Sequence, residues 1–90
     1  MVRITKGAGL AAVKEGQKVV LECNVTGSRP VQIAWVRDNV ILQKRNYMEN
    51  TSYVIHNVGF GDEGIYTCKA TNFEGEDEYQ IRLVIEKCRL

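Results

Sequence analysis

Three cysteines carry most of the chemistry that this chain could perform. Cys23 and Cys68 stand 45 residues apart, Trp35 lies between them, and Tyr66 precedes the second cysteine by two positions. This spacing is typical of a β-sandwich in which a disulfide joins two sheets, an indole packs against it and the tyrosine hydroxyl bonds to upstream backbone. Closing a loop of this size stabilises a fold by about 4 kcal/mol. The remaining cysteine, Cys88, leaves the redox compartment open, because three reduced thiols would be ordinary in a cytosolic protein.

The other titratable residues do not form a catalytic or metal-binding set. His56 is the only histidine, and we expect it to point outward from a strand. The acidic run 74–78 could bind Ca²⁺ loosely, but its spacing differs from that of a calcium loop and favours a solvated hairpin. The cysteines lack CxxC spacing, and no nucleophile–base motif or phosphate-binding loop occurs. The sequence therefore predicts no catalytic residue, no metal and no cofactor, and a protein that is not an enzyme.

Length and charge limit the remaining function classes. The 90 residues suffice for a single domain, 1–90, and the formal net charge is +1. No run of lysine and arginine is long enough to indicate a nucleic-acid partner. No apolar stretch approaches the length of about 18 residues that direct membrane insertion requires. Met1 stands directly before strand-like sequence, and we interpret the chain as a domain taken from a larger multidomain protein.

Alternation of apolar and polar residues dominates the chain and predicts seven or eight short strands. The clearest strand is 17–26. Further strands are expected over 31–37, 40–42, 52–58, 65–72 and 76–87, with turns at 27–30, 38–39, 59–62 and 72–75. Residues 44–51 are expected to be an irregular connection that includes at most a short strand. The first strand is expected in two parts, 3–5 and 10–13, because the glycines of 7–9 suit a kink that takes the chain from one sheet to the other.

Three segments resemble the I-set of the immunoglobulin superfamily, namely VKEGQKVVLEC, IAWVRDNVIL and YVIHNVGFGDEGIYTCKATNFEGEDE. The resemblance covers most of the chain. It implies an all-β, two-sheet, immunoglobulin-like sandwich of I-set type with Greek-key topology. It also implies that Cys23 and Cys68 form the disulfide and that Trp35 and Tyr66 belong to the structural core.

Two details follow from comparison with the same superfamily. I-set domains often carry two prolines before the strand that holds the tryptophan, whereas Pro30 is the only proline of this chain. The loop that leads into the strand of Trp35 is therefore expected to follow a different path from that of typical I-set domains. In variable-type relatives an arginine pairs with the aspartate that corresponds to Asp62. The resemblance therefore implies an ion pair between Asp62 and either Arg45 or Lys44.

The resemblance implies a non-enzymatic protein-recognition module of a cell-surface receptor or adhesion protein, located outside the cell. The alternative is a structural or scaffolding module of an intracellular muscle or cytoskeletal protein, in the cytoplasm, where these cysteines stay reduced. Cys88 slightly favours the alternative. In either setting the expected partner is another protein, including a second copy of the domain or an adjacent immunoglobulin-like domain.

Candidate partner-binding residues lie on the outer face of the sheet formed by strands 31–37, 65–72 and 76–87. They are Val36, Ile65, Lys69, Arg82 and Val84. Apolar residues grouped on a face that should contact solvent can mark an interaction surface. The alternative is that β-branched residues simply favour strands.

Loop tips and sequons provide further candidates. Phe73 is the large apolar residue expected to be most exposed, unless it folds onto its own hairpin, and 28–30 is a second tip. The sequons Asn24-Val25-Thr26 and Asn50-Thr51-Ser52 make Asn24 and Asn50 candidate N-glycosylation sites. Asn24 is expected to face outward because its neighbour Cys23 faces inward.

Overall fold

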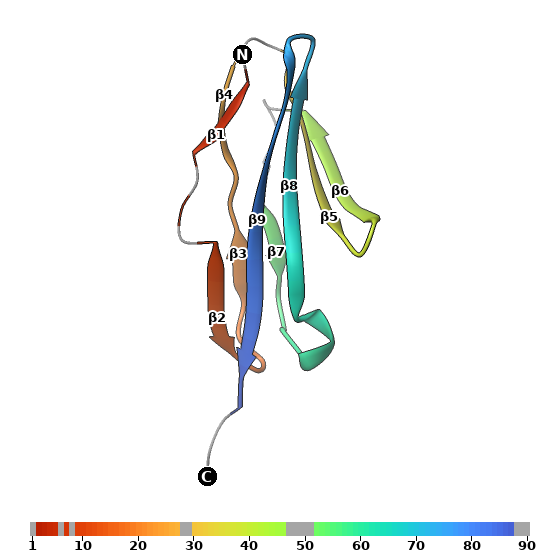
Figure 1. Cartoon of the computed structure of the whole chain (residues 1–90). Coiled ribbons are helices and arrows are strands. Elements are labelled where there is room, and N and C mark those ends of the chain that lie inside the picture. The colour runs from red at the N-terminus through yellow and green to blue at the C-terminus, as the bar shows by residue number, and fades with distance from the viewer. Residues whose placement is uncertain (1, 6, 8, 28–29, 47–51, 88–90) are drawn as a thin grey trace.

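The protein is a sandwich of two layers of β-strands in a computed structural model that describes residues 2–5, 7, 9–27, 30–46 and 52–87 (Figure 1). The molecule is elongated, with extents of 51 × 21 × 20 Å. The candidate glycosylation site Asn50, the third cysteine, Cys88, and the loop residues Ser28 and Arg29 lie outside the described residues. The all-β sandwich predicted from the alternation is confirmed.

One layer is a five-stranded sheet in the order β2-β9-β8-β5-β6. Its strands are β2 (Leu10–Lys14), β5 (Gln32–Arg37), β6 (Val40–Asn46), β8 (Gly64–Asn72) and β9 (Gly75–Glu86). All neighbours are antiparallel except β2 and β9, which run parallel. Two-residue turns join β5 to β6 and β8 to β9, so these pairs are tight hairpins.

The other layer contains four short strands. β1 (Arg3–Thr5) pairs with β4 (Asn24–Thr26), and β3 (Val19–Leu21) pairs with β7 (Tyr53–Ile55). The prediction of one continuous strand over 17–26 is wrong, because its two halves pair with different strands and are separated at residues 22–23. A 3₁₀ helix, η1 (Phe60–Asp62), leads from β7 to β8.

The split of the first strand is confirmed. β1 belongs to one layer and β2 to the other (Figure 1). Gly9, at the end of the crossing segment, has φ +71°, a left-handed conformation that residues with a side chain rarely adopt. The sheet change thus depends on a glycine at this position.

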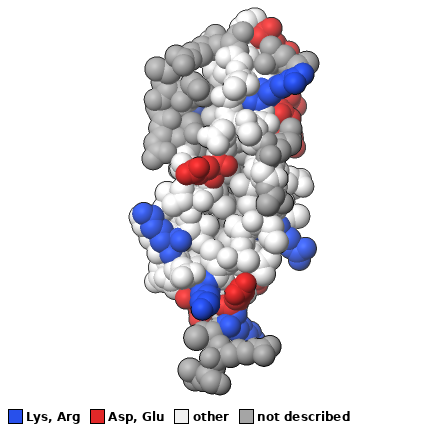
Figure 2. All heavy atoms as spheres, turned by 90° about the vertical axis from the view of Figure 1, so that its left-hand side faces the viewer, with Lys and Arg blue, Asp and Glu red and all other residues white. Residues whose placement is uncertain are grey.

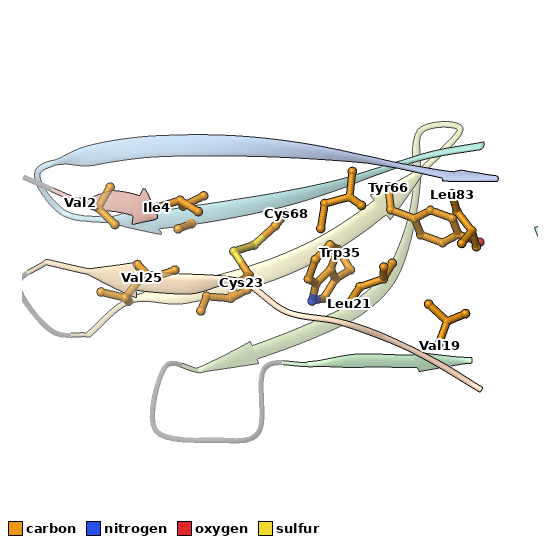
Figure 3. Close-up of a cluster of buried hydrophobic side chains, with 14 of the residues drawn as sticks. Val2, Ile4, Val19, Leu21, Cys23, Val25, Trp35, Tyr66, Cys68 and Leu83 are labelled. Carbon is orange, nitrogen blue, oxygen red and sulfur yellow. A yellow bond between two sulfur atoms is a disulfide. The ribbon is translucent and has the colours of Figure 1, made fainter. Parts of the chain in front are cut away.

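The buried residues of both layers form one apolar core (Figure 3). Cys23 and Cys68 are joined by a disulfide that crosses the space between the layers. Trp35 is 0% exposed and lies opposite Cys68 across the β5–β8 ladder. The largest fully buried side chains are Trp35, Tyr66, Ile33, Leu83, Val31 and Val58. The alternation of the sequence has therefore placed one face of each layer in the core.

The edge strand β6 is longer than the sequence suggests. It continues to Asn46, whereas 44–51 was expected to be irregular, so that expectation is wrong for its first three residues. Lys44 and Arg45 pair with Ala34 and Ile33 of β5. An edge strand can carry such charged residues because one of its sides remains open to solvent.

Candidate interaction surface

The outer face of the five-stranded sheet collects apolar residues from four strands. Val36 of β5 lies opposite Ile41 of β6. Ile65 of β8 lies opposite Arg82 of β9, and Arg82 lies opposite Leu10 of β2. Residues paired in this way point to the same side of a sheet, so their side chains share one surface.

Several of these apolar side chains are exposed to solvent. Leu10, Ile41 and Ile65 are 57%, 58% and 51% exposed, and Val36 and Val84 are half-buried on the same face. Hereafter, the outer face means the surface formed by Leu10, Val36, Ile41, Ile65, Lys69, Arg82 and Val84. Apolar side chains that are exposed together on one face can mark a protein-binding surface.

A hollow of about 370 Å³ occupies the middle of the outer face. Its lining combines aliphatic, amide and charged side chains, namely Val36, Asp38, Asn39, Ile65, Thr67, Lys69, Glu78 and Gln80. The Lys69 ammonium and the Glu78 carboxylate form an exposed ion pair of 3.7 Å across β8 and β9. An exposed pair contributes at most about 1 kcal/mol to stability, so both charges remain available to a partner.

The structure brings together five of the six residues that the sequence nominated for partner binding. Val36, Ile65, Lys69, Arg82 and Val84 all lie on the outer face. The sixth, Phe73, lies in the two-residue turn at the far end of the β8–β9 hairpin and is 77% exposed.

Asn24 and His56 lie away from the outer face. Asn24 is exposed on β4, in the opposite layer. His56 is exposed just after β7, as expected for a histidine that points outward.

Sequence reasoning missed Leu10 and Ile41. The alternation of β2 contains a signal for Leu10, since Ala11 and Val13 pack against the core and the residues between them must face outward. The predicted turn at 38–39 contains a signal for Ile41, because a two-residue turn places Ile41 opposite Val36. The irregularity in the β5–β6 register between Trp35 and Val36 lies beyond this pair.

Tyr66 forms a tyrosine corner at the η1 end of the sandwich. Its hydroxyl donates to the carbonyl oxygen of Asp62 at 2.6 Å and accepts from Nη1 of Arg37 at 2.8 Å. The guanidinium of Arg37 also lies 5.5 Å from the centre of the Tyr66 ring. Burial raises the pKa of the Tyr66 phenol, and the hydrogen bond to Tyr66 raises the pKa of Arg37.

The expected ion pair between Asp62 and Arg45 or Lys44 is wrong. Arg45 lies opposite Ile33, one residue before the end of β6. β6 ends on the side of the sheet away from η1 (Figure 1). Oδ2 of Asp62 instead accepts a hydrogen bond of 2.8 Å from the N–H of Gly59. The positive charge close to Asp62 belongs to Arg37, from the end of β5, which sequence reasoning did not consider.

The acidic hairpin has a structural role. Oδ2 of Asp77 accepts a hydrogen bond of 2.9 Å from the N–H of Ile4, which ties β1 to β9. Within the described ranges, no group of three or more His, Cys, Asp or Glu residues is arranged to hold a metal ion. The same part of the chain contains no helix with the length and apolar character needed to cross a membrane.

Comparisons with known proteins agree with this geometry. The family model of the immunoglobulin I-set domain matches residues 2–85. Human cell adhesion molecule 4 is 38% identical over 79 residues, which are 87% of this chain and 20% of that protein. Mouse palladin is 39% identical over 95 aligned residues, which cover 90% of this chain and 7% of palladin. The chain therefore spans about a fifth or less of the length of these relatives.

Solved structures share the fold over nearly the whole chain. A chain of the titin M10–obscurin-like 1 immunoglobulin complex matches with a TM-score of 0.81 at 18% identity, over 99% of this chain and 97% of that one. The structure of Sidekick-1 immunoglobulin domains 1–5 matches with a TM-score of 0.81 at 26% identity, over 97% of this chain and 20% of that one.

The disulfide between the layers, the buried indole beside it and the tyrosine corner define an immunoglobulin-like sandwich. With its first strand divided between both sheets and the family model matched over residues 2–85, the chain belongs to the immunoglobulin I-set family.

Proposed function

We propose that this domain is a non-enzymatic protein-recognition module of a cell-surface receptor or adhesion protein, and that it binds its partner through the outer face. The observation that carries the proposal is the exposure of Leu10, Ile41 and Ile65 together on one side of a rigid sheet. Similarity to cell adhesion molecule 4 supports the cell-surface setting.

The outer face has the composition that protein recognition needs. Its aliphatic side chains lose unfavourable contact with water on binding, at about 25 cal/mol for each Å² of apolar surface that is covered. Lys69, Glu78 and Arg82 lie among them and can fix the orientation of a partner and exclude others. A paired sheet is also a rigid platform, so binding requires little ordering of the backbone.

A pair of matched substitutions tests the proposal. Clustered, fluorescently labelled domain is applied to a panel of animal cells and to beads that carry the domain itself. We expect Ile65→Asp and Val36→Asp to weaken the observed binding by at least about tenfold. Val20→Asp is the control, because Val20 is 45% exposed on the opposite layer.

Circular dichroism and thermal unfolding of each variant show whether the fold is retained. Loss of binding in Ile65→Asp and Val36→Asp, with binding retained in Val20→Asp, supports the outer face. Equal binding by all three variants and the unmodified domain, or equal loss in all three, would exclude the outer face as the site.

The second candidate is a structural module of an intracellular muscle or cytoskeletal protein. The similarity to palladin and to the titin complex favours it. The two settings differ in the state of the disulfide, which is chemically measurable. Cys23 is 5% and Cys68 0% exposed, so alkylation must be done on acid-quenched, denatured protein taken from its native tissue.

Mass spectrometry then counts the alkylated thiols of the three cysteines. In the cell-surface setting only Cys88 is alkylated, because the disulfide protects the other two. In the intracellular setting all three are alkylated. Three alkylated thiols in native material would therefore reject the receptor proposal and favour the scaffold.

A further inference from the structure

Two side chains on the inner side of β9 hold the first strand in place by hydrogen bonds. The carboxylate of Asp77 accepts from the N–H of Ile4 at 2.9 Å. The hydroxyl oxygen of Tyr79 accepts from the N–H of Gly7 at 3.0 Å and from the N–H of Gly9 at 2.9 Å. The crossing segment between β1 and β2 is thus anchored to β9 by side chains.

The Tyr79 hydroxyl lies where the chain leaves one sheet and enters the other. The backbone ladder does not continue through this change, and the amide groups of Gly7 and Gly9 bond to the Tyr79 hydroxyl instead. A Cβ atom at Gly7 would lie 3.3 Å from the Tyr79 oxygen, which leaves almost no room for a side chain between them. The phenol and the two glycines therefore fit each other closely.

The next hydrogen bond starts the β2–β9 ladder. The N–H of Arg82 donates to the carbonyl oxygen of Gly9 at 2.8 Å, and Leu10 follows directly opposite Arg82. Gly9 thus bonds to β9 on both sides, through its N–H to Tyr79 and through its C=O to Arg82. β2 is a five-residue edge strand that pairs with β9 on one side only, so the hydrogen bonds of Gly9 lie at the start of the single ladder that sets its register.

We propose that Tyr79 is a positioning residue for the outer face. By fixing Gly9, its hydroxyl sets the register of β2 and brings Leu10 and Ala12 beside Arg82 and Val84. Its ring packs against the core, so it acts on the outer face from the opposite side of the sheet. Figure 2 shows the β1–β2 side of the molecule, where uncharged residues cover much of the surface near the β2 edge of the sheet.

The first test uses Tyr79→Phe, which removes only the hydroxyl, and amide hydrogen exchange of the 90-residue chain measured by NMR. We expect the amides of Gly9 and of β2 to exchange about tenfold faster, because a lost hydrogen bond of about 1.4 kcal/mol corresponds to a factor of ten. The amides of Trp35 and Cys68 in the centre of the sheet should keep their protection.

Tyr53→Phe is the matched control, because Tyr53 is a second partly buried phenol that lies in the opposite layer beside Trp35. Unchanged exchange of β2 in Tyr79→Phe would overturn the proposal. So would equal acceleration throughout the sheet, or acceleration of β2 to the same degree in Tyr53→Phe, since each indicates a general loosening of the core.

The link to binding rests on the proposed function and is tested separately. With the cells or beads described above, Tyr79→Phe and Leu10→Asp should weaken binding in the same direction. If neither Ile65→Asp nor Leu10→Asp alters binding, the outer face is rejected as a binding site, and the exchange experiment alone still decides whether Tyr79 sets the register of β2. If Ile65→Asp weakens binding and Tyr79→Phe does not, the positioning role is rejected and the outer face is retained.

Discussion

Replacement of Trp35 by alanine tests the apolar core that holds the two sheets together and supports the outer face. The indole is 0% exposed, its ring centre lies 6.5 Å from that of Tyr53, and it sits opposite Cys68 in the sheet. Removing a fully buried tryptophan destabilises a protein by about 3–5 kcal/mol, because apolar contacts are lost and a cavity remains. Small domains are stable by about 5–15 kcal/mol, so the change removes a large part of the total.

The assay is thermal and urea-induced unfolding followed by far-ultraviolet circular dichroism. Fluorescence is unsuitable, because Trp35 is the only tryptophan and the signal disappears with it. For a domain of this size, a loss of 3 kcal/mol lowers the melting temperature by at least about 12 °C. Phe73→Ala is the control, because this aromatic ring is 77% exposed and its removal should change stability by less than about 0.5 kcal/mol.

One result would refute the reasoning directly. If Trp35→Ala unfolds cooperatively within about 1 kcal/mol of the unmodified domain, with the same dependence on urea, the indole does not fill the space between the sheets. An equally large loss of stability in Phe73→Ala would also contradict the reasoning, because Phe73 is exposed and Trp35 is buried.

Three further predictions concern the corner, the crossing segment and the disulfide. Tyr66→Phe should destabilise the domain by about 1–3 kcal/mol, measured by urea unfolding, because the hydrogen bond to Asp62 is lost. Burial raises the pKa of Tyr66 above 10.0 in the folded state. The protonated phenol therefore contributes fully to the free energy of unfolding below pH 10, and this contribution is lost as the pH rises through the folded pKa. The loss of stability at alkaline pH should be smaller in Tyr66→Phe. Gly9→Ala should cost about 1 kcal/mol or more in the same assay, since φ is +71° there. Cys23→Ala with Cys68→Ala should lower stability by about 4 kcal/mol in calorimetry, and an unchanged melting temperature would contradict this.

The core could be predicted from the sequence because its signal is local. In a strand, successive side chains point to opposite faces, so the alternation around Val19, Leu21 and Val25 indicates which residues are buried wherever the strand is placed. The pairing of Cys23 with Cys68 followed from the resemblance to the I-set. The glycines of 7–9 likewise marked the split of the first strand before any partner strand was known.

The candidate site could be predicted only in part. Val36, Ile65 and Val84 follow from alternation, because each adjoins a residue that is buried in the core. Ile41 does not follow from alternation, because residues 40–42 are a continuous apolar run and only the pairing with Val36 shows which side Ile41 faces. The partner of Tyr66 was missed for a similar reason, since Arg37 stands 29 residues away and meets it only after both strands have paired.

The sequence by itself determined the sandwich and its buried face, because backbone alternation and side-chain type decide these residue by residue, and its resemblance to the I-set implied the disulfide. Tertiary structure decided which exposed residues share a surface and how its edge is held. Tyr79 and Gly9 are 70 residues apart, and nothing in either segment encodes their hydrogen bond. Such a contact exists only once β9 is paired with β8 and the first strand has crossed between the sheets, since its geometry depends on the packing of the whole domain.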